Sequence, residues 1–266
     1  MENKKTEIDI ILPNYNSSEF IELTIDSVIG QTHKNWNLII VDDCSDEKTK
    51  KILNKYSQNK NIQIVFLDKN KGAAFCRNHA LELSKSEYVA FLDSDDVWFP
   101  DKLTKQINFM KKNNYNFTYT NYTLNRKDRY GLYKNQWVRG YDISNQNSIR
   151  PREKYNFDIF IKDTSIATST MMIKGELARK YKFTDTKICE DYFYKCSILK
   201  EIGYAYCLNE SYTLYRIRKD SLQSNKLRNL YWIWKINSKF NKLNFFKNLN
   251  SVISISLKSL KKYGFK

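Results

Sequence analysis

The chain reads YVAFLDSDD at residues 88–96. The first five of these residues are apolar or aromatic, as in a short buried strand, and three carboxylates follow within four residues. Carboxylates packed so closely are electrostatically costly unless a cation accompanies them. Mg²⁺ and Mn²⁺ favour such oxygen ligands and often join one or two protein carboxylates to substrate phosphates. A solvated turn that caps the next helix is the alternative, so the meaning of the motif depends on the strand before it.

Three similar apolar segments precede this stretch, at residues 8–12, 36–41 and 62–67. Helical patterns alternate with them, at residues 17–31, 46–56 and 72–84, and Ser17 or Ser18 is the expected N-cap of the first helix. The alternation predicts βαβ units around a parallel sheet.

Polar clusters follow three of the four predicted strands, at residues 14–16, 42–43 and 93–96. Ligands of parallel α/β sheets bind beyond the carboxyl ends of the strands, where these clusters would meet. This convergence favours a binding site over a solvated turn at residues 93–96.

The second half of the chain is less regular. Further strands are predicted at 116–124, 130–138, 166–173, 204–208 and 212–217, with a helix at 188–200. The segment 139–163 is polar and loop-rich, which makes it a candidate acceptor-side region. From Lys226 onward the pattern is helical and basic.

The net charge of +16 suggests an anionic partner, but it is unevenly spread. The first 220 residues carry 35 basic and 29 acidic residues, a net charge of +6, and no acidic residue follows Asp220. No known nucleic-acid-binding motif is present, and acidic strand ends would repel phosphate without a metal, so we expect no nucleic-acid partner.

Five cysteines form no CxxC pair or Cys/His cluster, which argues against a zinc site or a disulfide framework. No apolar run approaches the length of a membrane span, and no secretory signal is recognisable. These features predict a cytoplasmic protein.

The order of these segments resembles the family 2 nucleotide-sugar glycosyltransferases, which have the GT-A fold. The similarity is carried by five blocks in the first 105 residues: Ile10–Asn16, Ser27–Thr32, Leu38–Ser45, Asn70–Asn78 and Leu92–Leu103. The last block contains the family's DxD motif. The resemblance implies an α/β fold of the GT-A type, with a Rossmann-like, mostly parallel sheet flanked by helices and here a C-terminal helical extension.

Two further blocks are shorter. Cys189–Phe193 is similar to the family's ED block, in which the second acid is the catalytic base, and Tyr215–Ser221 is similar to its YRxHxxS block. Cys44 stands where the family usually has Gly, and Arg218 where many members have His. A guanidinium cannot ligate a metal but can hold a diphosphate, so the role of Arg218 stays open.

The resemblance implies a set of site residues. The nucleotide-sugar would be held by Pro13, Tyr15, Asp43, Gly72, Arg77, Asp93, Ser94 and Asp95. Within this set, Pro13, Tyr15 and Asp43 would hold the base, and Arg77 would neutralise phosphate or position Asp43. Asp95 would ligate Mn²⁺ or Mg²⁺, with Asp93 at the metal or the ribose. Asp191 would be the catalytic base. Asp42 is interpreted as a turn or packing acid.

The implied activity is that of an inverting, metal-dependent hexosyltransferase. It would move a sugar from a nucleotide-sugar, expected to be UDP-linked by family frequency, to a hydroxyl of a glycan in surface-polysaccharide synthesis, such as O-antigen, capsule or lipooligosaccharide. The donor sugar and the acceptor are not determined by the residues, although a lipid-linked acceptor is expected by analogy. A non-enzymatic protein that binds nucleic acid or membrane through its basic tail is the alternative.

The expected domain division places a catalytic domain at 1–220 and a basic amphipathic tail at 221–266. Within the catalytic domain, 1–110 is the expected nucleotide-binding half and 111–220 the acceptor half. Helices with aromatic residues and lysines often lie on anionic membranes. Peripheral membrane contact through 226–266, packing of the tail on the catalytic domain and an oligomer interface are therefore the alternatives for the tail.

Overall fold

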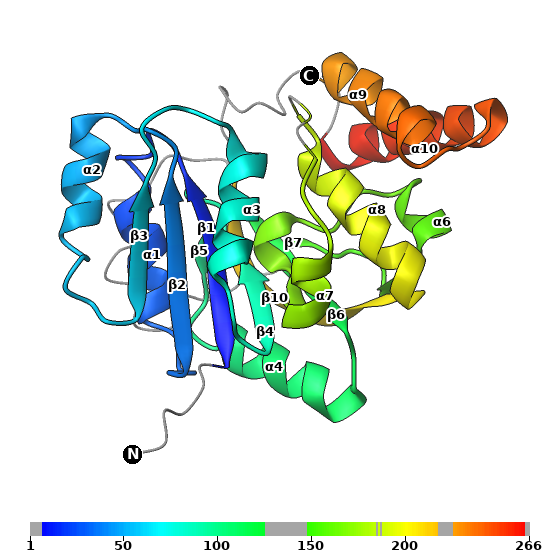
Figure 1. Cartoon of the computed structure of the whole chain (residues 1–266). Coiled ribbons are helices and arrows are strands. Elements are labelled where there is room, and N and C mark those ends of the chain that lie inside the picture. Colours follow the sequence, from blue (N-terminus) through cyan, green and yellow to red (C-terminus); the bar gives the residue numbers. More distant parts are fainter. Residues whose placement is uncertain (1–6, 126–147, 185, 187, 218–225, 264–266) are drawn as a thin grey trace.

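The computed structural model describes residues 7–125, 148–184, 186, 188–217 and 226–263. In this part of the chain, ten strands form one sheet in the order β3-β2-β1-β4-β9-β6-β10-β5, with β7 beside β6 and β8 beside β10. Helices lie on both faces of the sheet (Figure 1). This architecture confirms the predicted α/β class with C-terminal helices.

The strands are β1 (Ile8–Asn14), β2 (Trp36–Asp42), β3 (Ile62–Phe66), β4 (Tyr88–Phe91), β5 (Val97–Trp98), β6 (Phe117–Asn125), β7 (Ser148–Ile149), β8 (Lys154–Tyr155), β9 (Met172–Lys174) and β10 (Ala205–Arg216). The helices are α1 (Ile21–Ile29), α2 (Glu47–Asn54), α3 (Ala73–Leu83), α4 (Lys102–Asn113), α6 (Phe157–Phe160), α7 (Gly175–Lys180), α8 (Glu190–Ile202), α9 (Lys226–Lys239) and α10 (Phe245–Tyr263), with a 3-10 turn η2 (Thr168–Thr170).

The first four predicted strands form the parallel part of the sheet. β1 pairs with β2 and β4, and β2 pairs with β3, all in parallel. Side chains alternate between the two faces of a strand, so Ile10 of β1 packs into the core on the α1 side while Ile11 packs into the core beneath α3. Both faces are covered, which explains why these strands read as continuous apolar runs.

Beyond β4 the sheet becomes mixed. β9 is antiparallel to both β4 and β6, and β10 is parallel to β6. The strand predicted at 166–173 is wrong over its first part, because η2 occupies residues 168–170. The Thr170 hydroxyl donates to the carbonyl of Ala167 at 2.6 Å, and such local bonds of hydroxyl side chains compete with strand pairing.

One other prediction needs correction. The strands expected at 204–208 and 212–217 are one strand, β10, whose register shifts around Ser211. In the segment predicted to be loop-rich, 139–163, the described part contains the short elements β7, β8 and α6 between loops. The strand expected at 130–138 lies outside the described residues.

The predicted cap of the first helix is also wrong. α1 begins at Ile21 after Phe20, and no side chain caps it. The Ser17 hydroxyl instead donates to the side chain of Asn14. Ser17 therefore stabilises the loop after β1 instead of the helix, and α1 lacks the stability that a side-chain N-cap would add.

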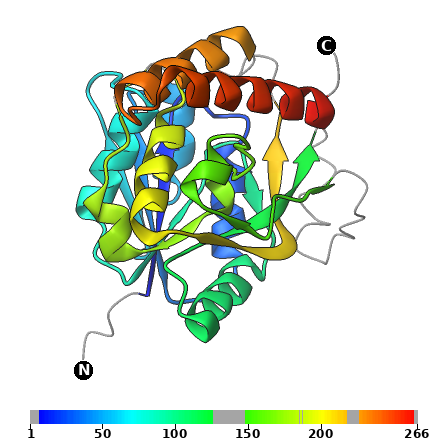
Figure 2. The same ribbon diagram turned by 90° about the vertical axis from the view of Figure 1, so that its right-hand side faces the viewer.

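The two C-terminal helices pack on the rest of the protein with one face (Figures 1 and 2). Ile233, Ile236 and Ile255 are buried in the core shared with the sheet. The Tyr192 hydroxyl donates to Asn237 Oδ1 at 2.8 Å. Packing on the domain, one of the alternatives for the tail, is thus observed for this face. Among the described residues, no helix has both the length and the apolar character to cross a membrane.

Candidate active site

The end of β2 carries two adjacent carboxylates with different surroundings, Asp42 as its last residue and Asp43 directly after it. Asp42 is fully buried and accepts hydrogen bonds from Asn14 Nδ2 at 2.6 Å and from the backbone N–H of Ser45 at 3.0 Å. Asp42 therefore ties the ends of β1 and β2 together, as its interpretation as a packing acid implies.

Asp43 faces the start of α3. Its two carboxylate oxygens accept the backbone N–H groups of Lys71, at 2.6 Å, and Gly72, at 2.8 Å. Gly72 has a φ of 87°, which L side chains rarely adopt, and it is the N-cap of α3. Tyr15 lies after β1 with half of its surface exposed. These residues come from neighbouring strand ends, where a flat ligand could stack on an exposed ring beside a fixed carboxylate.

Arg77 is not directed at Asp43, one of its predicted partners. Its Nη2 lies 2.7 Å from Asp93 Oδ1 and its Nη1 lies 2.6 Å from Glu190 Oε1, and its side chain is only 7% exposed. Burial disfavours the charged guanidinium, but Asp93 and Glu190 outweigh this effect and raise the pKa of Arg77. Two carboxylates on separate elements thus draw Arg77 away from the Asp43 loop.

The carboxylates after β4 point in different directions. Asp96 is buried, accepts the Ser169 hydroxyl at 2.5 Å and the backbone N–H of Arg216 at 2.9 Å, and so joins β4 to β10. Asp93, Ser94 and Asp95 are half-buried. Burial, followed by the charges of Asp95 and Asp93, raises the pKa of Asp96 well above its ordinary value.

This excess of negative charge fits a divalent cation. In the described residues no group of three or more His, Cys, Asp or Glu side chains is arranged to hold a metal ion. Mg²⁺ and Mn²⁺ commonly use only one or two protein carboxylates, with substrate phosphates and water completing the shell. Asp95 and Asp93 have the chemistry for that arrangement, and an added cation would relieve the repulsion that Asp96 experiences.

Asp191 lies in the first turn of α8 and contacts two side chains. Its Oδ2 accepts from Lys195 Nζ at 2.6 Å and from the Thr168 hydroxyl at 3.0 Å. Burial would raise the pKa of Asp191, but the charge and hydrogen bond of Lys195, with a smaller effect of Arg77, lower it to about 2. The carboxylate is therefore ionised at any physiological pH.

Several partners of the site were not predicted. Glu190 was quoted only as part of a motif, and Thr168, Ser169 and Lys195 were not singled out. Lys195 carries one local signal, since it follows Asp191 by four residues on a predicted helix. Ser169 has no such signal, because only the tertiary fold brings it to Asp93 and Asp96. Arg218 lies outside the described residues.

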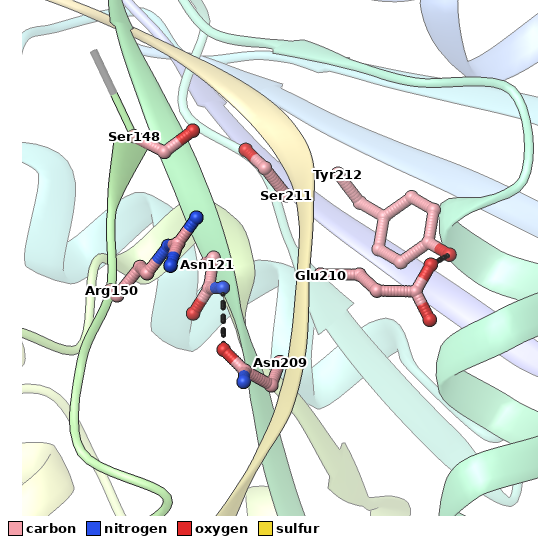
Figure 3. A pocket seen from close by; sticks show the side chains of 7 residues that line it. All are labelled: Asn121, Ser148, Arg150, Asn209, Glu210, Ser211 and Tyr212. Carbon is pink, nitrogen blue, oxygen red and sulfur yellow. Dashed lines mark hydrogen bonds between the residues drawn. The ribbon is translucent and has the colours of Figure 1, made fainter. Parts of the chain in front are cut away.

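A polar cavity of about 360 Å³ lies between β6, β7 and β10 (Figure 3). Its lining consists of Asn121, Ser148, Arg150, Asn209, Glu210, Ser211 and Tyr212. Asn121 Nδ2 donates to Asn209 Oδ1 at 2.9 Å, and the Tyr212 hydroxyl donates to Glu210 (Figure 3). Amides, hydroxyls and a carboxylate together are groups that bond sugar hydroxyls, and the sequence did not indicate this cluster.

Comparison with known proteins identifies the family and the fold. A sequence model of glycosyl transferase family 2 matches residues 9–182. The chain is 35% identical over 263 residues to the Bacillus subtilis protein named for teichuronic acid biosynthesis, the glycosyltransferase TuaG, covering 98% of this chain and 99% of the relative. It is 32% identical over 235 residues to the Escherichia coli UDP-Glc:alpha-D-GlcNAc-diphosphoundecaprenol beta-1,3-glucosyltransferase WfgD, covering 86% and 84% of the two chains.

Solved structures show the same fold at low sequence identity. Staphylococcus aureus TarS 1–349 in complex with UDP has a TM-score of 0.67 at 18% identity, with 96% of this chain and 72% of that chain covered. The Pyrobaculum calidifontis mannosyltransferase PcManGT in complex with GDP-Man and Mn²⁺ has a TM-score of 0.66 at 14% identity, covering 99% and 77%. With the family model matching more than half of its residues, the chain belongs to glycosyl transferase family 2 and is a glycosyltransferase.

Proposed function

We propose that this glycosyltransferase moves a sugar from a UDP-sugar to a hydroxyl of a lipid-linked saccharide, with inversion at the anomeric carbon, during synthesis of a bacterial surface polysaccharide. The observation that carries the proposal is the Arg77 bridge. Because Arg77 binds Asp93 and Glu190 at once, the loop after β4 and the start of α8 lie against each other. The donor-binding carboxylates and the base would then act at one reaction centre.

On the donor side, Tyr15 would stack on the nucleotide base beside Pro13. Asp43, held by the N–H groups of Lys71 and Gly72, would accept the imide N–H of the base. Each carboxylate oxygen of Asp43 has a second lone pair, so these backbone bonds leave acceptor capacity for a ligand. The UDP-Glc in the name of WfgD supports uridine as the base.

The diphosphate would lie over Asp93, Ser94 and Asp95, with Asp95 as the direct metal ligand. When bound, a divalent cation stabilises the negative charge that develops on the departing nucleoside diphosphate. The carboxylates would hold that cation, and Arg77 would keep Asp93 in place through their 2.7 Å contact.

Asp191 would accept the proton of the acceptor hydroxyl as its oxygen attacks the anomeric carbon. Direct displacement with one base inverts the configuration. A retaining route would require a second nucleophile or a front-face attack. The residues assigned to this site include no second nucleophile. The name of WfgD includes a diphosphoundecaprenol acceptor, which supports a lipid-linked acceptor for this chain.

We expect the chain to hydrolyse or transfer from a UDP-sugar in the presence of Mn²⁺, and to lose this activity when EDTA removes the metal. A screen of UDP-, GDP- and dTDP-sugars with and without Mn²⁺, monitored by release of the nucleoside diphosphate, measures donor and metal together. Asp95→Asn should abolish the metal-dependent rate because it removes the ligand charge.

Asp101→Asn is the matched control, since Asp101 is exposed before α4 and bonds the Thr32 hydroxyl. It should retain the rate. If none of these donors is consumed with either Mn²⁺ or Mg²⁺, the proposed metal-dependent transfer is refuted.

The exposed side of the C-terminal helices supports contact with an anionic membrane. We define the apolar tail face by seven exposed residues of α9 and α10: Leu227, Tyr231, Phe245, Phe246, Leu249, Ile253 and Leu257. The rings of Trp234 and Phe245 lie 5.6 Å apart, which joins the two helices into one surface. An apolar patch of this kind on a monomer marks an interaction site.

The charge around this face supports the proposal of an anionic lipid surface over a neutral partner. Lys235, Lys239 and Lys242 are exposed, and the two helices contain no acidic residue. α9 and α10 lie at the end of the molecule toward which β1, β2 and β3 point (Figure 1). A bilayer bound there would be near the mouth of the active site, where a lipid-linked acceptor must arrive.

The double substitution Phe246→Ser and Leu257→Ser should weaken binding to phosphatidylglycerol vesicles by at least about tenfold. Burying each large apolar side chain contributes roughly 1.5–3 kcal/mol, and both side chains are more than half exposed in the free protein. Flotation with vesicles of phosphatidylglycerol or phosphatidylcholine measures the effect, and added salt should reduce binding to the anionic vesicles.

Tyr204→Ser removes an exposed ring outside the tail and should bind vesicles like the wild type. Binding that is independent of lipid charge and of both tail substitutions would refute the membrane proposal. A wild-type dimer that the double variant converts to a monomer would identify a second copy of the chain as the occupant instead.

A further inference from the structure

A lysine is buried behind the proposed catalytic base. Lys195, in the second turn of α8, is 2% exposed. Its Nζ lies 2.9 Å from the carbonyl oxygen of Ile166, 3.2 Å from Thr168 Oγ1 and 2.6 Å from Asp191 Oδ2. An ammonium group has three N–H donors, and each has an acceptor here. A buried charge satisfied in this way has one fixed position.

The contacts of Asp191 are one-sided. Oδ2 accepts from both Lys195 and Thr168. No described residue bonds to Oδ1, and the side chain of Asp191 retains 19% of its exposed surface. The described residues therefore hold the carboxylate through one oxygen and leave the other available to a ligand.

We propose that Lys195 is a positioning residue that anchors Oδ2 of Asp191, so that Oδ1 is the atom that receives the acceptor proton. This inference rests on the proposed role of Asp191 as the base. In the reaction, the proton of the acceptor hydroxyl passes to Oδ1 and the oxygen's electron pair forms the new bond to the anomeric carbon. The bond from that carbon to the diphosphate oxygen breaks, and the nucleoside diphosphate leaves with the bonding pair.

The second consequence concerns charge. The groups that act on Asp191 are Lys195 on its own helix, Arg77 from α3 and Thr168 from η2, and Arg77 also pairs with the adjacent Glu190. Lys195 contributes the largest lowering of the pKa of Asp191. A low pKa reduces the intrinsic strength of the base but keeps it fully deprotonated. Lys195 therefore keeps the Asp191 carboxylate oriented and ionised, and it lowers the basicity of that carboxylate.

Lys195→Met tests the proposal, because methionine has a similar length and no charge. An opposite charge at this distance lowers a carboxyl pKa by about 1–3 units. In a plot of kcat/KM against pH, the acid limb should therefore move to higher pH by about that amount. At neutral pH, kcat should fall while the KM for the donor stays constant. A structural role alone would lower the melting temperature without moving the acid limb.

Thr168→Val separates orientation from charge. It removes one bond to Oδ2 but keeps the ammonium group, so kcat should fall while the acid limb moves upward by less than in Lys195→Met, because Lys195 lowers the pKa of Asp191 more than Thr168 does. If Lys195→Met does not fold, Lys195→Arg retains the charge but not the three fixed bonds and should behave like Thr168→Val.

An unmoved acid limb together with an unchanged kcat in these variants would overturn the role of Lys195. The failure of the underlying function gives a different result, since it requires Asp191→Asn to remain active. An inactive Asp191→Asn beside fully active Lys195 variants refutes only the positioning role.

Discussion

Asp191→Asn should lower the rate of sugar transfer by at least about 100-fold while leaving donor binding nearly unchanged. General-base catalysis contributes about 10²–10⁴ in rate, and an amide cannot accept the acceptor's proton. Asparagine has nearly the same volume, and its carbonyl oxygen can still accept from Thr168 and Lys195, so the local fold should persist. Single-turnover transfer measures the chemical step, and calorimetric titration with UDP and Mn²⁺ measures donor binding.

The matched control is Asp158→Asn, which removes an exposed acid paired with Lys247 at 2.7 Å. This variant should transfer at the wild-type rate. Asp191→Asn would contradict the assignment if it retained more than about a tenth of the wild-type rate and still bound the donor. Weakened donor binding in Asp191→Asn would instead indicate that Asp191 acts on the nucleotide-sugar.

The parallel half of the fold was predictable because its signals are local. Strands buried on both faces produce continuous apolar runs, and the helices between them have their own period. The mixed half was predicted less well. At residues 168–170 the β-branched threonines favour a strand. The Thr170 hydroxyl instead bonds the nearby carbonyl of Ala167, the Thr168 hydroxyl donates to Asp191, and the carbonyl of Ser169 accepts from Trp98 Nε1 at 2.7 Å. That indole comes from β5, 71 residues away, and no local pattern reports such a partner.

The same distinction applies to the site. Asp43, Asp93 and Asp191 stand in recognisable motifs, because each follows a strand end or opens a helix. The groups that hold these three carboxylates in place do not belong to a recognisable motif. Arg77 was predicted to neutralise phosphate or to position Asp43. The structure shows it bonded to Asp93 and Glu190, which are 16 and 113 residues away, and its action on phosphate stays a prediction. Contacts between distant side chains depend on packing, which the sequence reports only indirectly.

Charge was the most misleading feature of the sequence. The surplus near the C-terminus predicted a basic amphipathic tail with several alternative roles, and the helices there divide their residues between two environments. Ile236 is fully buried against the domain, whereas Phe246 is 79% exposed. Lys247 and Lys258 pair with Asp158 and Asp163, so only part of the tail's charge remains available to an external anion. The amphipathic pattern thus divides into a face that packs on the domain and an exposed face, and the sequence did not indicate which residues belong to which.

Arg77→Met should lower the free energy of unfolding by about 3–5 kcal/mol and strongly reduce transfer. Removing one partner of a buried ion pair leaves an uncompensated charge, and this typically costs that amount. Here the loss is shared by two acids, Asp93 and Glu190, whose side chains are 27% and 17% exposed. Urea unfolding measures stability, and the kinetic assay above measures transfer at a temperature where the variant is still folded.

A double-mutant cycle separates the bridge from the mere loss of a large side chain. If repulsion between unpaired carboxylates causes the instability, Arg77→Met combined with Glu190→Gln should be more stable than the sum of the two single losses predicts. Its transfer rate should remain low, because the neutral pair no longer connects the loop after β4 to α8. Simple additivity of the two changes, or full activity of the double variant, would show that Arg77 only fills space beneath the site. A stable but inactive double variant would mean that the bridge aligns the donor loop with Asp191, and that the protein bears the cost of burying three charges to obtain this alignment.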